Sequence, residues 1–185
     1  MNRDQGYKLV TDWTKNNNLV KHMLAVEAEM RGLARHFDED ENLWGLTGLI
    51  HDADYEQMQE KHPSEKLFEQ LEKLGADKRI IQAVKSHAFK WPDGAPEPEG
   101  KMEWSLYCCD ELSGLIIACA LVQPDKKLSS VNVESVLKKW NKKDFAKGVH
   151  REQIAMCEEK LEIKLDQFIE LNLRAMQKIS DNLGL

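Results

Sequence analysis

The chain has few of the residues that mark disulfide-rich, collagen-like or disordered proteins. Among its 185 residues are four cysteines, five prolines and ten glycines. The cysteines lack the C-x-x-C spacing of zinc and redox sites and are too sparse for a disulfide framework, so we expect buried free thiols in a reducing compartment. The low proline and glycine content excludes a low-complexity chain and indicates an ordinary globular protein.

Long hydrophobic runs are also missing. The longest one covers residues 115–122, which is far below the roughly 18 residues of a membrane span. The N-terminal segment carries charges throughout and has no apolar core of the kind that a secretory signal needs. We therefore expect a cytoplasmic protein without a membrane partner. The net charge of -6 argues against a nucleic-acid partner, because phosphate binding needs a positive surface.

Strand-like alternation is absent, and the spacing of apolar residues is helical nearly everywhere. We predict an all-α fold in one domain, residues 1–185, because a chain of this length can build one full core. Residues 89–100 contain three prolines and should form a long surface loop. The predicted helices cover residues 5–15, 19–33, 39–52, 63–74, 77–87, 102–122, 132–140, 151–160 and 165–183.

Three ionisable residues lie on inward helix faces. His22 stands three residues after Leu19 and four before Val26, so it borders a buried stripe. His87 has the same relation to the stripe of its own helix. Asp110 has apolar or small neighbours one turn away, and burial of its carboxylate is costly unless it pairs with a cation or a hydrogen-bond donor. Each residue is either a metal ligand or a satisfied polar residue of the core, and for Asp110 a lysine or arginine of another helix is the alternative partner.

Two further histidines and an aspartate complete the candidate set. His51 and Asp52 end an apolar helix with two metal-competent side chains in consecutive positions. Imidazole nitrogen and carboxylate oxygen together suit Mn, Fe, Zn or Mg, and one carboxylate can bridge two ions. His62 precedes Pro63 at a predicted helix start, where the alternative is a surface capping residue.

The order His22, His51-Asp52, His62, His87 and Asp110, in helical context, resembles the H...HD...D pattern of the HD-domain superfamily of metal-dependent phosphohydrolases. The resemblance covers about residues 19–122, and residues 130–185 would be a C-terminal helical extension of a single HD-type bundle. Further stretches look like a bacterial HDIG-type branch. These are His51 to Glu56, His62-Pro63, Ser86-His87, Asp110 to Gly114, Ser135 to Arg151 and Asn182 to Leu185.

The resemblance implies the ligand roles. His22, His51, Asp52 and Asp110 would hold a first metal ion, and His62 and His87 a second, with Asp52 bridging. The cofactors are thus one or two divalent ions. Many relatives have Gly-Lys soon after the HD pair, where this chain has Asp54-Tyr55, so cyclic dinucleotide hydrolysis loses support.

We expect hydrolysis of a small phosphomonoester or nucleotide by a metal-activated water, since G-x-S-x-G, Walker A and H-E-x-x-H sequences are absent. Asp52 and Asp54 are the catalytic candidates. Asp54 is either a proton carrier or outer-shell group, or an ordinary capping residue.

Lys90 and Trp91 are candidates for substrate binding, and the alternative is that they belong to an exposed loop without such a role. The basic stretch Lys138 to Arg151 either guides anionic substrates or RNA or is a solvated face. Alternative functions are a di-iron oxygenase and a non-catalytic nucleotide-binding regulator.

Overall fold

A computed structural model describes residues 1–90 and 94–185, and these residues form helices joined by turns, with no strand in the described ranges. The predicted all-α fold is confirmed. The α-helices are α1 (Arg3–Trp13), α2 (Asn17–Phe37), α3 (Glu41–Ile50), α4 (Tyr55–Met58), α5 (Glu65–Lys73), α6 (Lys78–Ser86), α7 (Lys101–Leu121), α8 (Val133–Trp140), α9 (Arg151–Lys160), α10 (Leu165–Gln177) and α11 (Ser180–Leu183).

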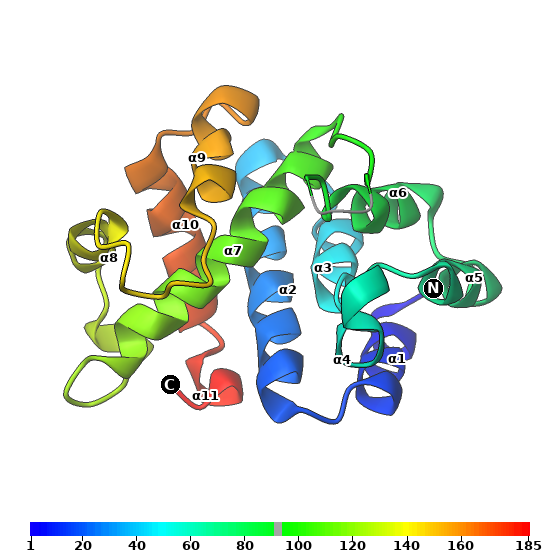
Figure 1. Cartoon of the computed structure of the whole chain (residues 1–185), viewed down its shortest axis with the longest axis horizontal. Helices are drawn as coiled ribbons and strands as arrows, with labels where there is room; N and C mark the ends of the chain where they lie inside the picture. Colours follow the sequence, from blue (N-terminus) through cyan, green and yellow to red (C-terminus); the bar gives the residue numbers. More distant parts are fainter. Residues whose placement is uncertain (91–93) are drawn as a thin grey trace.

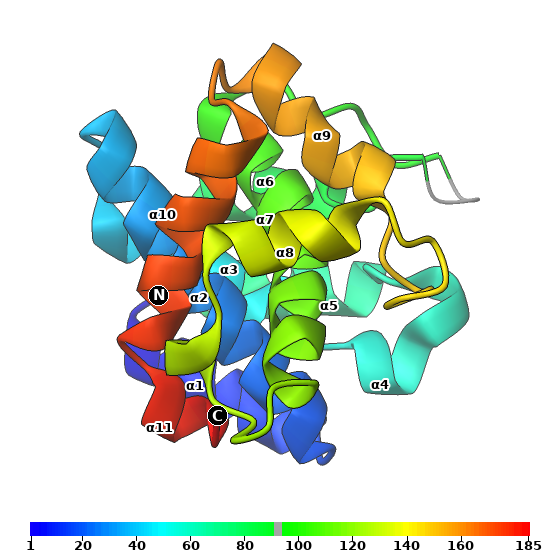
Figure 2. The ribbon, with the colours of Figure 1, turned by 90° about the vertical axis from the view of Figure 1, so that its left-hand side faces the viewer.

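The two long helices α2 and α7 run through the centre of the molecule (Figure 1). Helices α1 and α3 to α6 lie on one side of them, and α8 to α11 lie on the other. Figure 2 views the molecule from the second side, with α8, α9 and α10 in front of the central pair. Helix α2 packs directly against α3, α7 and α10, so it contacts both sides.

The hydrophobic core has two clusters that correspond to these sides. One cluster joins residues of α1, α3, α5 and α6 to α2, and the other joins α2 and α7 to the C-terminal helices. Leu24 and Leu43 pack against both clusters. We call the two sides the N-terminal side, residues 1–90, and the C-terminal side, residues 128–185, with α7 between them.

Helix starts follow local sequence signals. Asp40 caps α3 and Asp77 caps α6, each with its carboxylate accepting a backbone N–H, and Gly75 takes the positive φ that ends the α5 region. Two expectations need correction. The predicted helix 165–183 is interrupted, since α10 ends at Gln177 and a separate short helix begins at Ser180. The sequence reading also missed the short helix α4.

Helix α7 is the one helix among the described residues that is long and apolar enough to cross a membrane. Two thirds of its apolar window, 67%, is buried inside the bundle, which is the environment of a core helix. The cytoplasmic location stays a prediction. All four cysteines are buried free thiols, as the sequence predicted.

Candidate metal centre

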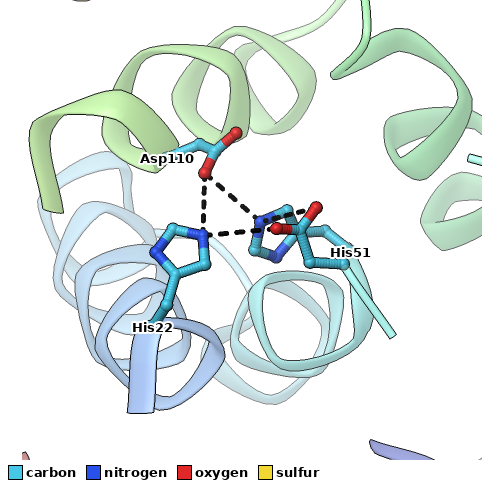
Figure 3. A group of neighbouring side chains, drawn as sticks. His22, His51 and Asp110 are labelled. Carbon is cyan, nitrogen blue, oxygen red and sulfur yellow. Dashed lines mark ion pairs between the residues drawn. The ribbon is translucent and has the colours of Figure 1, made fainter. Parts of the chain in front are cut away.

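Three of the predicted ligands converge from three helices. His22 comes from α2, His51 follows the last residue of α3, and Asp110 comes from α7 (Figure 3). The Nε2 atoms of His22 and His51 lie 3.0 and 3.4 Å from the same Asp110 oxygen. No lysine or arginine within the described ranges pairs with Asp110, so the histidines, and not a basic residue of another helix, face this carboxylate.

Asp52 connects these residues to a second group. Its Oδ2 atom lies 3.5 Å from Nε2 of His22. Its Oδ1 atom lies 2.8 Å from Nε2 of His62 and 3.5 Å from Nε2 of His87. The same Oδ1 atom lies 3.5 Å from Nε2 of His51. Asp52 therefore contacts imidazoles of both groups, and a carboxylate has the two oxygens that a bridging ligand requires.

Helices α2 and α3 approach closely enough to bring His22 and His51 together because Gly48 has no side chain. A Cβ at Gly48 would lie 2.6 Å from the carbonyl oxygen of Val26 on α2, which no real side chain tolerates. Since Gly48 also supplies the carbonyl that contacts His51, the same position sets both the helix spacing and the ring orientation.

All four site histidines are held by Nδ1 and present Nε2 to the carboxylates. Nδ1 of His51 lies 2.8 Å from the Gly48 carbonyl, and Nδ1 of His87 lies 2.6 Å from the Val84 carbonyl. Since a carbonyl only accepts, both rings carry their proton on Nδ1. His22 contacts Ser113 Oγ at 3.0 Å, and that hydroxyl already donates to the Asp110 carbonyl. His62 contacts Asp54 at 2.5 Å. Such outer contacts fix the ring of a metal-binding histidine.

The donor set fits divalent cations. Nε2 of His51 is buried and has no hydrogen-bond partner among the described residues, which is costly unless a cation or proton meets it. The Nε2 atoms of His62 and His87 face each other at 2.9 Å, a contact that needs a shared proton or cation. The ligand atoms form two groups, each within 4.8 Å, with Asp52 in both: His22, His51, Asp52 and Asp110, and Asp52, His62 and His87.

The electrostatics of the cluster favour positive charge at its centre. Burial raises the pKa of Asp52, yet the surrounding histidines outweigh it and hold that pKa well below the usual value. Burial lowers the pKa of His22, yet Asp110 and Asp52 raise it well above 6.5. Burial also lowers the pKa of His62, while the carboxylates of Asp52 and Asp54 raise it to about 9. The site therefore holds negative charge on buried carboxylates, and this charge must be balanced by protons or cations.

His62 and Asp54 form a unit behind the second group. The His62 side chain is only 8% exposed, and Ser64, not His62, caps α5, so the surface capping alternative for His62 is wrong. Asp54 makes no side-chain cap bond to α4. Its carboxylate, 1% exposed, contacts Nδ1 of His62 and accepts the Ser64 N–H. This geometry favours the outer-shell role for Asp54, whose part in catalysis stays a prediction.

A cavity of about 210 Å³ opens over the cluster. Four of its lining residues are predicted ligands: Asp52, His62, His87 and Asp110. The sequence analysis missed the others, which are Tyr55, Ala88, Phe89 and Glu111 together with Gly148, His150 and Gln153 from the C-terminal side. His150 lies between predicted helices, where no periodic pattern could have marked it.

The predicted substrate-binding residue Lys90 is not among the residues that line this cavity. Lys90 is exposed, and its ammonium lies over the ring of Phe89, 5.3 Å from the centroid. Trp91 lies outside the described residues. Within the basic stretch, Lys138 pairs with Glu134 on the surface, and Arg151 binds backbone carbonyls. A substrate role for Lys90 and for this stretch remains a prediction.

Glu29 is another residue that the sequence analysis missed, and it does not line the cavity. Its side chain on α2 is fully buried, and neither carboxylate oxygen has a hydrogen-bond partner in the described part of the chain. Burial raises its pKa well above 4.5, His22 lowers it, and Asp110 raises it again. A signal existed, because Glu29 follows His22 by seven residues and so shares its helix face.

The described residues form a helical bundle in which four histidines and two aspartates gather in two groups that share Asp52, and this arrangement defines a candidate metal centre. The family model described as "HD domain" matches residues 19–118, more than half of the chain, and the chain belongs to the HD domain family. HD domains are typically metal-dependent hydrolases. No curated protein and no solved structure gives a significant match. The HDIG-type branch stays a prediction.

Proposed function

We propose that the protein is a metal-dependent phosphohydrolase that hydrolyses a small phosphomonoester or a nucleotide. The observation that carries the proposal is the common orientation of His22, His51, His62 and His87, each held at Nδ1 and directed by Nε2 toward Asp52 or Asp110. Core packing alone gives no reason for four imidazole rings to point Nε2 toward two carboxylates. Binding of divalent ions does, because the ligand atoms must converge on the ion and the rings must be held in position.

The candidate ligands are divided between two proposed metal ions. The first group, with His22, His51 and Asp110, would hold one ion, and His62 with His87 would hold the other, while Asp52 contacts both groups. Divalent ions bound there supply an activated water near neutral pH and offset charge on a phosphoryl group. No protein nucleophile is required, which agrees with cysteines whose pKa is raised by burial.

The size of the cavity supports a small substrate. Its volume of about 210 Å³ is below the roughly 300–1,000 Å³ of pockets that enclose drug-sized ligands. A phosphate group fits beside the buried carboxylates, and the alcohol part of an ester would extend toward the mouth. The overall charge of -6 argues against a long polyanionic substrate.

The test begins with protein freed of metal and reloaded separately with Mn²⁺, Fe²⁺, Mg²⁺ and Zn²⁺. Elemental analysis should give close to two ions per chain, and a panel of phosphomonoesters and nucleoside monophosphates should show released phosphate only in loaded samples. Bound metal without turnover of any phosphate ester would contradict the proposed reaction. Absence of bound metal under all four conditions would contradict the site itself and favour a regulatory nucleotide-binding protein.

A di-iron oxygenase is the second candidate. Asp52, His62 and His87 form a set of two histidines and one carboxylate, which is the ligand type of non-haem iron oxygenases. Oxygen uptake by the Fe²⁺-loaded protein, with no phosphate release in any metal form, would favour this function over hydrolysis.

A further inference from the structure

The C-terminal side reaches the cavity through the segment 141–150, which joins α8 to α9. Gly148 and His150 from this segment, and Gln153 from the start of α9, line the cavity together with the candidate ligands. These residues lie beyond the family match, which ends at residue 118. The wall they form therefore lies outside the part of the chain that matches the family model.

Several contacts hold the segment in place. The Arg151 guanidinium donates to the carbonyl oxygen of Phe145 at 2.7 Å and contacts those of Lys142 and Lys139 at 3.4 and 3.5 Å. Val149 packs against α7 at Gly114, where a Cβ would lie 3.5 Å from the valine methyl group. The segment has little regular structure of its own, so these contacts fix its position.

His150 has a fixed orientation. Its ring Nδ1 lies 2.9 Å from Oε1 of Glu111, and its backbone N–H donates to Oε2 at 2.8 Å. Because Nδ1–H donates to the carboxylate, Nε2 is the ring nitrogen left for a further partner, and no described residue bonds to it. The His150 side chain is 53% exposed and that of Glu111 18%. The ring thus stands at the mouth of the cavity, while Asp52 and His87 line its floor.

Glu111 links the mouth to the metal centre. It follows the candidate ligand Asp110 directly on α7, and both residues line the cavity. Through Glu111, the ring of His150 is therefore attached to the same helix that supplies Asp110. A substrate would match this site if its phosphate lay on the floor of the cavity and a polar atom of its alcohol part lay at the mouth.

We propose that His150, positioned by Glu111, binds the alcohol part of the substrate, with its exposed Nε2 bonding to an oxygen of the group esterified to phosphate. The inference rests on the proposed phosphohydrolase function. His150 is then a specificity residue supplied from outside the family core, and it discriminates a phosphate ester from free phosphate.

The test uses Mg²⁺-loaded protein with two probes, inorganic phosphate and the non-hydrolysable methylenephosphonate analogue of adenosine monophosphate. Carbethoxylation of His150 by diethyl pyrocarbonate is followed by mass spectrometry of the peptide. The analogue should slow modification of His150, whereas inorganic phosphate should not, because phosphate alone does not reach the mouth. This readout needs no mutation and no turnover.

Calorimetric titration of variants provides the second arm. His150→Gln should weaken binding of the analogue about tenfold, the usual size of one lost hydrogen bond, and leave binding of phosphate and the metal content unchanged. Glu111→Gln should give a smaller loss in the same direction. His36→Gln is the matched control, since His36 is an exposed histidine at the far end of α2, and it should behave as wild type.

The outcomes separate the two proposals. If the analogue leaves His150 unprotected, or if it binds His150→Gln as tightly as wild type, the role of His150 is overturned, while hydrolysis by wild type still supports the phosphohydrolase. If wild type binds neither probe and hydrolyses no ester, the proposed function fails and the role of His150 fails with it.

Discussion

The N-terminal and C-terminal sides contribute to the cavity in different ways. The N-terminal side, with α7, provides the ligands from helix faces and helix ends, and each ring is held by a second contact such as Gly48 to His51. The C-terminal side provides its wall mainly from the non-helical segment 141–150, with His150 held by Glu111. Rigid elements suit groups that need fixed geometry, and segments between elements suit recognition. The candidate metal ligands and the proposed specificity residue His150 thus come from different sides of the molecule.

We expect the largest effect from Asp52→Ala, which removes a candidate ligand of the N-terminal side. Because Asp52 belongs to both ligand groups, the variant should lose both ions, and hydrolysis should fall by at least about 1000-fold, or about 4 kcal/mol. His62→Ala is the matched variant, because His62 belongs to the second group only, and it should retain one ion. Elemental analysis of both proteins decides the matter. Full metal content in Asp52→Ala would refute the shared ligand.

Glu29→Gln tests α2, the helix of the N-terminal side that also packs against α10 of the C-terminal side. The folded carboxyl stays protonated above pH 4.5 because burial raises its pKa, whereas the unfolded chain releases the proton there. Wild type therefore loses stability as pH rises above 4.5, by about 1.4 kcal/mol per pH unit while Glu29 remains protonated. The variant has no such loss, so its advantage should grow with pH. Urea unfolding at several pH values measures this, and parallel pH profiles would contradict it.

Asp54→Asn separates the second ion from the first. Loss of the carboxylate behind His62 should weaken binding of the second ion about 10- to 100-fold, the usual cost of an altered outer contact. The first ion should bind as before, since none of its ligands contacts Asp54 in the described residues. Competitive metal titration resolves the two affinities. Equal weakening of both would show that Asp54 acts through the fold and not through His62.

Arg151→Ala should affect the C-terminal side alone. The guanidinium that binds the Phe145 carbonyl is lost, at a cost of about 1.5 kcal/mol, so the Tm should fall by about 3–6 °C. Limited proteolysis should cut within residues 141–150, while metal content stays at the wild-type level. Loss of metal from this variant would mean that the two sides are not separable.

Much of the fold and part of the candidate site could be predicted from local sequence patterns. His22 and Asp110 could be found because each breaks an apolar stripe whose period is that of a helix. Asp77 and Gly75 marked helix ends through capping chemistry. These residues could be identified from the sequence because their signals depend only on neighbours a few positions away in the chain.

Other features depended on contacts between distant segments. The pairing of Glu111 with His150 spans 39 residues, and no spacing rule predicts it. Glu29 was overlooked because a surface helix has a polar face, whereas α2 is enclosed by α3, α7 and α10. The position of His62 beside His87 likewise depends on how α5 and α6 fold back, which a dipeptide such as His62-Pro63 does not show.

Asp110 and Glu111 are consecutive residues of α7, about 100° apart around its axis, and they face the metal ligands and the mouth of the cavity respectively. A shift or rotation of this helix would displace both together. If His150 has the proposed role, substrate preference can change through new side chains at the mouth or through lengthening and shortening of residues 141–150. Replacement of that short segment is then the natural way to alter selectivity while leaving the candidate ligands in place.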